Sequence, residues 1–520
     1  MKRTIALALA TLALLPGVAA AAPGGLDPSF DGDGKRLLPQ PGFANVVLVQ
    51  PDRKIVVVGN GGPANDFAVT RLLPDGSYDR SFDGDGTAFA DFGGQDQATA
   101  AALQRDGSIV VAGERSTAVG GDALAVARFL PSGNLDPKFG SSGDGKAVIE
   151  DATAPHDAAA VLIRPDGRIV IPGPGYSDTY DMAIVQLTKA GVADGTVWDR
   201  GNFGDQAQPA GAALTPDGGL VVAGTLYPEL TPSEIAVARF RPDGKLDAAF
   251  GEAGKVTLAT GVDEDVREVL MQRDGKVVVA GTKGRTTGQM TVTRFDRAGR
   301  LDRTWAGDGQ ASADWDGYSM GAAAALQPDG KIVVAGVWVS EIDMAAARFT
   351  PAGALDPTFG TRGQATIPGG FIEVTQAVAL QPDGRIVLAG VATGGAPVVR
   401  LLGDAPRGGG ASPPPVGDTL PPALTGLKVA GKRKRIRFRL SEAARVRFTV
   451  QRLRHGRYSA AARSFSVNAP AGISRVRFRG RRLRTGRYRL TATPVDRAGN
   501  TGRPRRVPFR LVKPTQRKNR

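Results

Sequence analysis

The sequence predicts an all-β protein, a seven-bladed β-propeller with shared-blade closure followed by a small antiparallel β-sandwich. Two observations carry this prediction: a ten-residue phrase that recurs along the chain, and a C-terminal region in which arginine alternates with apolar residues. Residues 327–336 read QPDGKIVVAG and residues 381–390 read QPDGRIVLAG. The glycine that closes the phrase recurs at intervals of 51 to 60 residues, a period suited to a four-stranded blade, at Gly59, Gly113, Gly173, Gly224, Gly281, Gly336 and Gly390.

Each repeat unit is written as strands and tight turns. In the sixth unit, AAAALQ (322–327) leads through PDG to KIVVAG (331–336), and a loop leads to MAAARF (344–349) and LDPTFGTRGQATI (355–367). Proline presets φ, aspartate bonds its own backbone and glycine adopts positive φ, which together make a hairpin turn. The apolar, β-branched run after the turn predicts a buried strand.

The two ends of the array are partial units. Residues 26–38 (LDPSFDGDGKRLL) form the last quarter of a unit, whereas residues 397–402 (PVVRLL) form a third strand without its fourth. Joined, they complete one blade and leave no exposed sheet edge, the usual way in which a propeller closes. We therefore predict a propeller over residues 26–403.

The recurring pattern also resembles a known repeat. QPDGKIVVAG, an acid before an ARF-type strand, and then PDG-x-LD-x-x-F-G are similar to the delta-60 repeat of bacterial secreted and surface proteins. The resemblance covers all seven units and implies a propeller in an extracellular setting, without implying an activity. The third unit departs from the pattern, because Gln186 replaces an arginine and ADGTVWDRGNFG (193–204) replaces the LD-x-x-F segment.

The N-terminus is typical of a secretory signal peptide over residues 1–22. Lys2 and Arg3 precede an apolar run, and small residues that suit cleavage follow it. No later segment is apolar enough to span a bilayer, so we expect a secreted, extracellular protein that is associated with the cell surface at most. The chain has no cysteine and two histidines, which excludes thiolate-bound cofactors and disulfides. We expect no cofactor and assign no metal ligands, and the sequence leaves open whether Ca²⁺ or another ion lies on the propeller axis.

The C-terminal region has a different composition. Residues 404–422 form a Pro/Gly-rich linker, residues 423–513 alternate strictly, and residues 514–520 form a basic tail. The alternation is typical of a half-buried antiparallel sheet, for example in RIRFRL (435–440). With the closing VDRAGNTG, the region resembles the immunoglobulin-like and fibronectin type III-like domains appended to bacterial secreted proteins.

Charge divides the chain into two parts. The formal net charge is +15, yet residues 421–520 hold 30 Lys/Arg against two acids, Glu442 and Asp496, which leaves the rest of the chain at −13. Such an imbalance predicts attraction to anionic envelope polymers or polysaccharide; specific nucleic-acid binding is disfavoured because few aromatic side chains are left exposed for stacking. The candidate polyanion-binding residues are Arg435, Arg437, Arg439, Arg445, Arg447, Arg475, Arg477 and Arg479.

Residues that recur once in each unit are predicted to be structural. An active site is normally a single site, so a charge pair repeated in every blade is better explained as an ion pair that locks a turn. The arginines are Arg71, Arg128, Arg239, Arg294, Arg348 and Arg400, the aspartates are Asp79, Asp136, Asp247, Asp302 and Asp356, and the aromatic residues predicted to pack the core are Phe30, Phe82, Phe139, Phe250, Trp305 and Phe359.

Function is expected where the repeats differ, in the loops on the face opposite the Pro-Asp-Gly hairpins. These loops are rich in acids, which would focus a negative potential if they converged on the axis. The candidate binding residues are Asp66, Asp96, Asp122, Asp157, Asp181, Glu234, Glu264, Asp265, Asp343 and Glu373.

We therefore expect a monomeric, non-catalytic binding or scaffold protein, with an unidentified protein or glycan ligand on the propeller. The alternative is a propeller enzyme, a hydrolase or lyase on glycans or esters, that uses a pair of these carboxylates.

Overall fold

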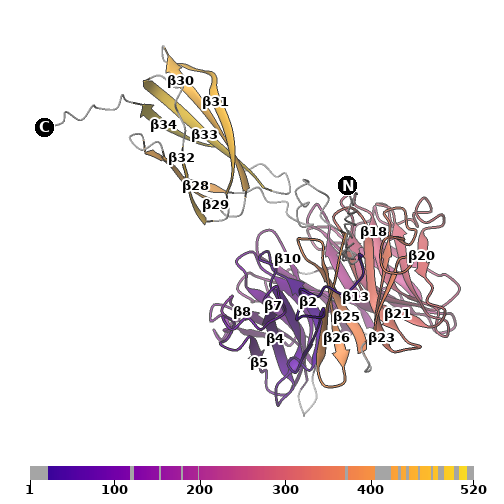
Figure 1. The fold of residues 1–520 in the computed structure, drawn as a ribbon. Helices are drawn as coiled ribbons and strands as arrows, with labels where there is room; N and C mark the ends of the chain where they lie inside the picture. Colours follow the sequence, from indigo (N-terminus) through magenta and orange to yellow (C-terminus); the bar gives the residue numbers. More distant parts are fainter. Residues whose placement is uncertain are drawn as a thin grey trace, which may run out of the picture.

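The computed structural model describes most of the propeller region and parts of the C-terminal region (Figure 1). The described ranges are 22–116, 122–151, 154–176, 180–196, 198–368, 373–404, 423–430, 435–440, 444–454, 457–469, 472–477, 485–496 and 503–511. Within them the chain is all-β, with strands and turns and no helix, so none of these segments is a helix able to cross a membrane. The predicted signal peptide, the linker beyond Asp404 and the basic tail lie outside the described residues.

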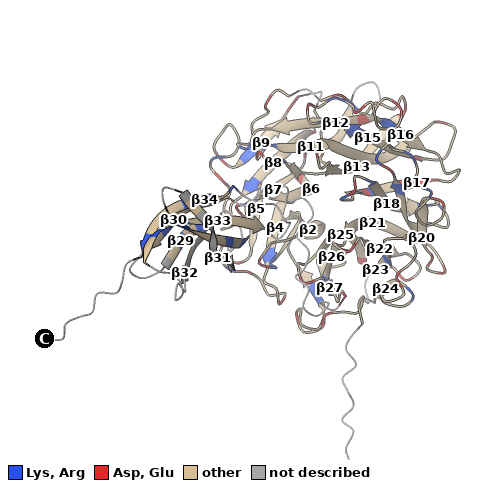
Figure 2. Cartoon of the chain, turned by 90° about the horizontal axis from the view of Figure 1, so that it is seen from above, with Lys and Arg blue, Asp and Glu red and all other residues tan. Residues whose placement is uncertain are grey.

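Residues 22–404 form seven antiparallel sheets, and Figure 2 shows them arranged around a common centre. In the described residues, six of these sheets have four strands and one has three. The first two are β2 (Phe43–Val49), β3 (Ile55–Gly61), β4 (Asp66–Leu72), β5 (Thr87–Ala90), and β6 (Gln95–Leu103), β7 (Ile109–Ser116), β8 (Ala123–Phe129), β9 (Lys146–Ile149). The third is β10 (Leu162–Ile163), β11 (Ile169–Tyr176), β12 (Tyr180–Leu187).

The next three sheets each have four strands in chain order. They are β13 (Gln206–Leu214), β14 (Leu220–Tyr227), β15 (Glu234–Phe240), β16 (Lys255–Leu258); β17 (Glu264–Met271), β18 (Val277–Lys283), β19 (Gln289–Phe295), β20 (Gln310–Ala313); and β21 (Ser319–Leu326), β22 (Ile332–Trp338), β23 (Asp343–Phe349), β24 (Gln364–Ile367).

The remaining sheet joins the two ends of the array. Its order is β1 (Lys35–Leu38), β27 (Ala396–Leu401), β26 (Ile386–Ala392) and β25 (Glu373–Leu380). The antiparallel pairing of β1 with β27 is the one that the two partial units predict. β2 also packs against β25 and β26, so the first sheet, in indigo, lies beside the last, in orange (Figure 1).

The glycine that closes the recurring phrase is required by a close backbone contact. In the sixth unit Gly336 pairs with Gly321, and the register of the first strand then shifts at a β-bulge before Ala323. A Cβ on Gly336 would collide with the carbonyl oxygen of Met320, and each of the other six closing glycines faces a backbone carbonyl oxygen in the same way. The bulge brings the first strand too close for any side chain.

The Pro-Asp-Gly turns have the predicted geometry. In the sixth unit the Gly330 N–H donates to the Gln327 carbonyl at 2.9 Å, and Gly330 has a φ of +89°. Only glycine adopts this conformation without strain, so the turn residues fix the hairpins that set each strand pair in register.

The recurring arginine–aspartate pair is confirmed as an ion pair. Arg71 Nε lies 2.7 Å from Asp79 Oδ2, its guanidinium carbon lies 4.6 Å from the centre of the Phe82 ring, and its Nη1 donates to the Pro131 carbonyl of the next sheet at 2.7 Å. One side chain therefore ties a turn, an aromatic residue and the neighbouring sheet together. The other pairs are Arg128–Asp136, Arg239–Asp247, Arg294–Asp302, Arg348–Asp356 and Arg400–Asp27; the six aromatic residues predicted as core are all buried.

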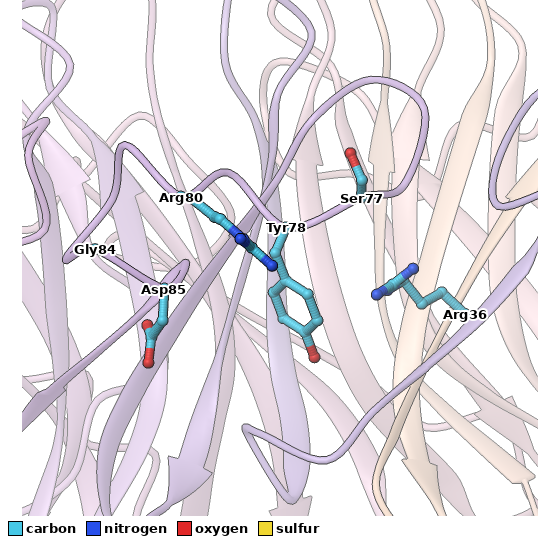
Figure 3. A pocket seen from close by; sticks show the side chains of 6 residues that line it. All are labelled: Arg36, Ser77, Tyr78, Arg80, Gly84 and Asp85. Atoms are coloured by element: carbon cyan, nitrogen blue, oxygen red, sulfur yellow. The ribbon is translucent and has the colours of Figure 1, made fainter.

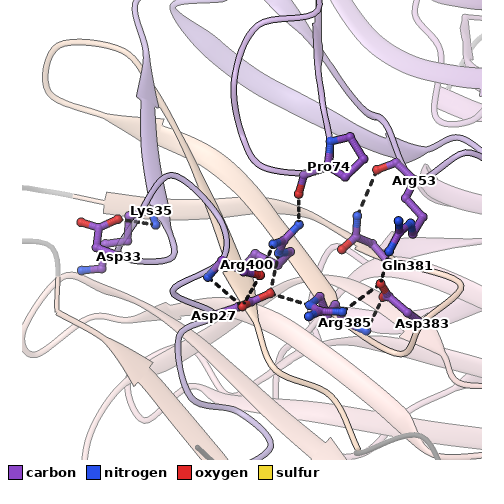
Figure 4. A network of polar contacts seen from close by, with 10 residues as sticks. Asp27, Asp33, Lys35, Arg53, Pro74, Gln381, Asp383, Arg385 and Arg400 are labelled. Carbon is purple, nitrogen blue, oxygen red and sulfur yellow. Dashed lines mark hydrogen bonds and ion pairs between the residues drawn. The ribbon is translucent and has the colours of Figure 1, made fainter.

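The partner of Arg400 comes from the other end of the array. Arg400 Nε donates to Asp27 Oδ2 at 2.8 Å, and Arg400 also donates to the carbonyl of Pro74 in the first sheet. Figure 4 shows Asp27 holding both Arg400 and Arg385. The ion pair that locks a turn within the other units here joins the two ends of the chain segment.

In the third unit, arginine and glutamine have exchanged places. In the other units the residue before the Pro-Asp-Gly, Arg-Asp-Gly or Pro-Asp-Arg turn is glutamine, as at Gln50, or threonine. The third unit has Arg164 at that position, and it has Gln186 on the third strand, where the other units have arginine. Gln186 donates to Asp194 Oδ2 at 2.7 Å and accepts from Arg164 Nη1 at 2.7 Å. The Arg164 guanidinium lies 5.9 Å from the Trp198 ring centre and donates to the carbonyl of Pro242. It thus makes the aromatic contact and the contact to the next sheet that the missing arginine would make, while Gln186 bonds the aspartate.

The described parts of residues 423–511 form two further sheets. One is β28 (Leu424–Ala430), β29 (Arg435–Leu440), β32 (Gly472–Arg477); the other is β31 (Arg457–Ala469), β30 (Ala444–Arg454), β33 (Gly486–Asp496), β34 (Arg505–Leu511). Alternate residues of both sheets share one core, which includes Ile436, Phe438, Val446 and Phe448. The arginines between these core residues, Arg437, Arg439, Arg445 and Arg447, are exposed, as the alternation predicts.

Candidate functional site

The acids predicted on the loop face meet in small groups at the junctions between sheets. An acid at the start of a third strand lies near an acid at the start of the next sheet's first strand, because both strand ends lie on the face opposite the hairpins. Buried members of the predicted set are Asp66, Asp96, Asp181, Glu264 and Glu373. Among the described residues, a single group of three acids comes within ligand distance, and the binding role of the full set of loop acids stays a prediction.

That group consists of Asp66, Asp91 and Asp96. One carboxylate oxygen from each lies within 4.8 Å of the others. Asp66 opens β4, Asp91 directly follows β5, and Asp96 lies near the start of β6, so the group joins the first sheet to the second. Asp96 Oδ2 accepts the Phe92 N–H at 2.8 Å, and Asp91 Oδ1 accepts the Gly93 N–H at 2.6 Å.

Two of these carboxylates hold protons more tightly than an exposed aspartate. Burial raises the pKa of Asp66, and the charges of Asp91 and Asp96 raise it further. Burial also raises the pKa of Asp96, while the Phe92 N–H and the charges of Arg115 and Lys146 oppose that rise. Like charges at short range in a desolvated site disfavour ionisation, and a bound cation or proton would relieve them.

A second group lies between the second and third sheets and contains Glu114, Asp122 and Asp157. Burial and the charges of Asp122 and Asp157 raise the pKa of Glu114 to about 7. Burial also raises the pKa of Asp157, which accepts a hydrogen bond from Thr99 Oγ1 at 2.7 Å. Asp122 itself is exposed. A carboxyl group that titrates near neutral pH is able to exchange protons under physiological conditions.

The other predicted acids are placed individually. Asp181 accepts Arg200 Nη1 at 2.7 Å, so its charge is neutralised within the protein. Asp265 pairs with exposed Arg267 at 2.7 Å. The remaining four lie at two junctions. Glu234 starts β15 near Glu264 on β17. At the other junction, burial raises the pKa of Glu373, and the charge of Asp343 raises it further.

Sequence reasoning missed Asp91, Glu114 and Glu268. Asp91 follows a fourth strand and lies five residues before Asp96, while Glu114 follows a closing glycine, where other units have Asn60, Thr225 or Thr282. The sequence could have indicated Glu114, because it places a carboxylate at a position that is neutral in the other units. Glu268 lies beside the bulge of β17, and burial raises its pKa to about 7.

Two cavities lie away from these acids. One, of about 500 Å³, is shown in Figure 3 and is lined by Arg36, Ser77, Tyr78, Arg80, Gly84 and Asp85. The Arg36 guanidinium carbon lies 4.8 Å from the Tyr78 ring centre, and Arg36 pairs with Asp31 at 2.6 Å. The other, of about 190 Å³, is lined partly by the Asp383, Arg385 and Arg400 side chains of Figure 4.

Four of the candidate polyanion-binding arginines have described side chains, and all four face solvent. Arg437, Arg439, Arg445 and Arg447 are exposed. In register, Arg437 lies opposite Lys428 on one side and Arg475 on the other. Arg435 and Arg477 are also opposite each other on β29 and β32, whereas Arg479 lies outside the described residues.

Comparison with known proteins supports the fold of the first region. Residues 50–82, 104–139, 215–250 and 327–359 match a family model described as "Domain of unknown function (DUF5122) beta-propeller". Residues 22–404 form a β-propeller. No curated protein matches the chain.

Solved structures with some likeness to the propeller are distant. A protein of unknown function from Dyadobacter fermentans DSM 18053 is 12% identical, with 71% of this chain and 99% of that chain covered and a TM-score of 0.38. A PL25 polysaccharide lyase, an ulvan lyase, is 10% identical, with 74% and 95% covered and a TM-score of 0.35. A glucose dehydrogenase is 11% identical, with 71% and 99% covered and a TM-score of 0.33. Similarities this low carry no inference about activity.

Proposed function

We propose that the chain is an exported, non-catalytic binding protein. In this proposal a closed, seven-bladed propeller of delta-60-like repeats presents an acidic loop face to a protein or glycan ligand. A basic, immunoglobulin-like sandwich attaches the molecule to anionic polymers of the cell envelope or matrix.

Ring closure is supported by contacts between neighbouring sheets. β1 pairs with β27, β2 packs against β25, and the first strands β13, β17, β21 and β25 contact one another in sequence. A ring completed by both ends of the array leaves no free sheet edge for association with other chains, which suits an extracellular monomer.

The observation that carries the attachment role is the row of like charges across the first C-terminal sheet. Exposed Lys428 and exposed Arg437 are directly opposite, and Arg475 is the next residue in the same row. Like charges at opposed positions of a sheet are destabilising, and an anionic polymer lying across the row would remove the repulsion.

The second C-terminal sheet repeats this arrangement. Exposed Arg487 on β33 lies opposite exposed Arg510 on β34. Because the whole region has only two acids, the protein itself supplies little neutralising charge. Both outer faces of the sandwich are therefore suited to a long, flexible polyanion.

A salt titration of polymer binding tests the proposal. Dextran sulfate serves as the anionic probe and neutral dextran as its control, with the mature full-length protein as the binder. We expect R437Q/R439Q to weaken binding roughly tenfold and to lower the dependence of log Kd on log salt concentration by about two.

The matched control removes two exposed arginines from the propeller. R168Q/R241Q has the same change in net charge, and its arginine side chains are 50% and 52% exposed. It should bind like the wild type, and both double variants should unfold at the wild-type temperature. Binding that is insensitive to salt, or equally weakened by the control, would overturn the attachment role.

An enzymatic role is the second candidate, favoured by Glu114. Its pKa of about 7, next to Asp122 and Asp157, suits a general acid in a hydrolase or lyase that acts on glycans or esters. The test is turnover of a panel of acidic glycans and esters by the wild type and by E114Q. Turnover that is retained in E114Q would exclude Glu114 as the acid.

A further inference from the structure

The junction between the first and second sheets has the composition of a cation site. Three carboxylates from three separate segments converge there, and their nearest oxygens lie within 4.8 Å of one another. We propose that Asp66, Asp91 and Asp96 bind one calcium ion that clamps the two sheets together. This inference does not depend on the proposed function.

Two buried oxygens in this group lack a hydrogen-bond partner. Asp66 is 8% exposed and Asp96 is fully buried, and Oδ1 of each has no donor within reach. Buried carboxylate oxygens are almost always paired, since an unpaired one is costly to desolvate. A cation between them would satisfy both.

Backbone N–H groups hold one carboxylate oxygen of Asp96 and one of Asp91. The Phe92 N–H holds Asp96 Oδ2 at 2.8 Å, and the Gly93 N–H holds Asp91 Oδ1 at 2.6 Å. Both donors belong to the loop between β5 and β6, so that loop presents the site. Exposed Asp91 gives solvent and ions a route to the buried pair.

Nearby cationic side chains have other partners. Lys146 Nζ donates to the backbone carbonyl of Asp91 at 2.8 Å, and Arg115 lies 3.7 Å from Glu150. These side chains reduce the negative charge of the site without bonding to the free oxygens of Asp66 and Asp96.

The donor set favours calcium over magnesium. Magnesium demands a near-ideal octahedral set of oxygens at about 2.0–2.1 Å, whereas calcium takes flexible sets at about 2.3–2.6 Å. Calcium also accepts irregular sets of carboxylate and water oxygens, as three aspartates with an open side would provide.

The junction at β23 and β25 offers a matched control. It has two acids, Asp343 and Glu373. The residue directly after its fourth strand, β24, is Pro368, whereas the residue directly after β5 in the first sheet is Asp91. Lys35 lies near Glu373 and lowers its pKa, in opposition to the larger effect of burial. Because the described residues of this junction include no third acid and a lysine lies nearby, it should not bind calcium.

The test is calcium binding to the full-length mature protein after removal of metal with EDTA. Calorimetry near neutral pH should show one ion per chain, and the melting temperature of the wild type should rise with calcium concentration, roughly logarithmically above the Kd. D66N and D96N should show neither a heat of calcium binding nor a calcium-dependent rise in melting temperature. D91N should bind calcium roughly tenfold more weakly than the wild type, and E373Q should bind it as the wild type does. Magnesium should bind at least about tenfold more weakly.

Several outcomes would overturn the proposal. One is a wild type that shows no heat of binding and no change in melting temperature at millimolar calcium. Another is a calcium affinity that is unchanged in D66N or D91N, and a third is a loss of calcium affinity in E373Q as large as in those variants. A more stable D66N with no calcium response in the wild type would indicate a carboxyl pair that shares a proton instead. If D66N and D96N fail to fold, D91N decides, because its side chain is exposed and holds only the Gly93 N–H.

Discussion

The propeller and the C-terminal sandwich use arginine in opposite ways. In the propeller, a recurring arginine is buried, paired with an aspartate and placed against an aromatic ring, as Arg128 is with Asp136 and Phe139. In the sandwich, arginines such as Arg437 are exposed and lie opposite other basic residues. The same residue type is therefore structural in one region and available for binding in the other.

Burial and pairing, rather than residue type, separate these roles. A buried guanidinium is stable only with a carboxylate and further acceptors, so its position is dictated by the fold. An exposed guanidinium contributes little to stability, so selection for binding is free to accumulate it. Each prediction below tests one side of this contrast.

The largest effect is expected from R128A. It removes the partner of buried Asp136, which Arg128 Nη2 approaches to 2.7 Å, and should lower the free energy of unfolding by about 3–5 kcal/mol. Thermal melts of the propeller measure the loss. R241A, which breaks an exposed pair with Asp243, should change the free energy by less than about 0.5 kcal/mol.

The loss in R128A should also depend on pH. Burial alone would raise the pKa of Asp136, but the Lys138 N–H and Arg128 lower it overall. A lowered pKa adds stability above the ordinary pKa of aspartate and loses it as the pH falls through the value in the folded protein. The difference in the free energy of unfolding between the wild type and R128A should therefore decrease in acid. A difference that does not change with pH would contradict an ionic origin.

An intermediate effect is expected from exchanging Arg164 and Gln186. Each single variant should destabilise the third sheet. R164Q leaves no guanidinium over Trp198, and Q186R places a second guanidinium beside that of Arg164. The double variant R164Q/Q186R restores the pattern of the other units. The double-mutant cycle should give a coupling of about 1–2 kcal/mol, and simple additivity of the single effects would show that the two positions act independently.

The smallest effect is expected from E114Q, because Glu114 has no paired arginine among the described residues. Because the pKa of Glu114 is raised from 4.5 to about 7, its protonated form is favoured in the folded protein, and stability falls as pH rises through this range. In acid, E114Q and the wild type should have the same free energy of unfolding. Above neutral pH, E114Q should be more stable by about 1 kcal/mol, a value that is reduced because Glu114 is partly exposed. Melting temperatures across the pH range measure this difference, and a difference independent of pH would be evidence against it.

The sequence by itself determined the local structure. Turn residues, the period-2 pattern and the spacing of eight residues from Arg71 to Asp79 depend on backbone sterics and short-range hydrogen bonds, so they predicted the hairpins, the buried aromatic residues and the ion pairs. The departure at Gln186 was also visible, although its compensation by Arg164 was not, because that contact joins the first and third strands of a sheet.

Only the tertiary structure decided which side chains from different sheets meet. Asp27 and Arg400 lie at opposite ends of the array, and Asp66, Asp91 and Asp96 come from three segments of two sheets. Their separations depend on how the sheets pack and where each loop turns, and packing is set by many weak contacts spread over the core rather than by the residues beside each acid. The sequence therefore predicted an acidic loop face, and the packing of the sheets grouped its acids into separate junction sites.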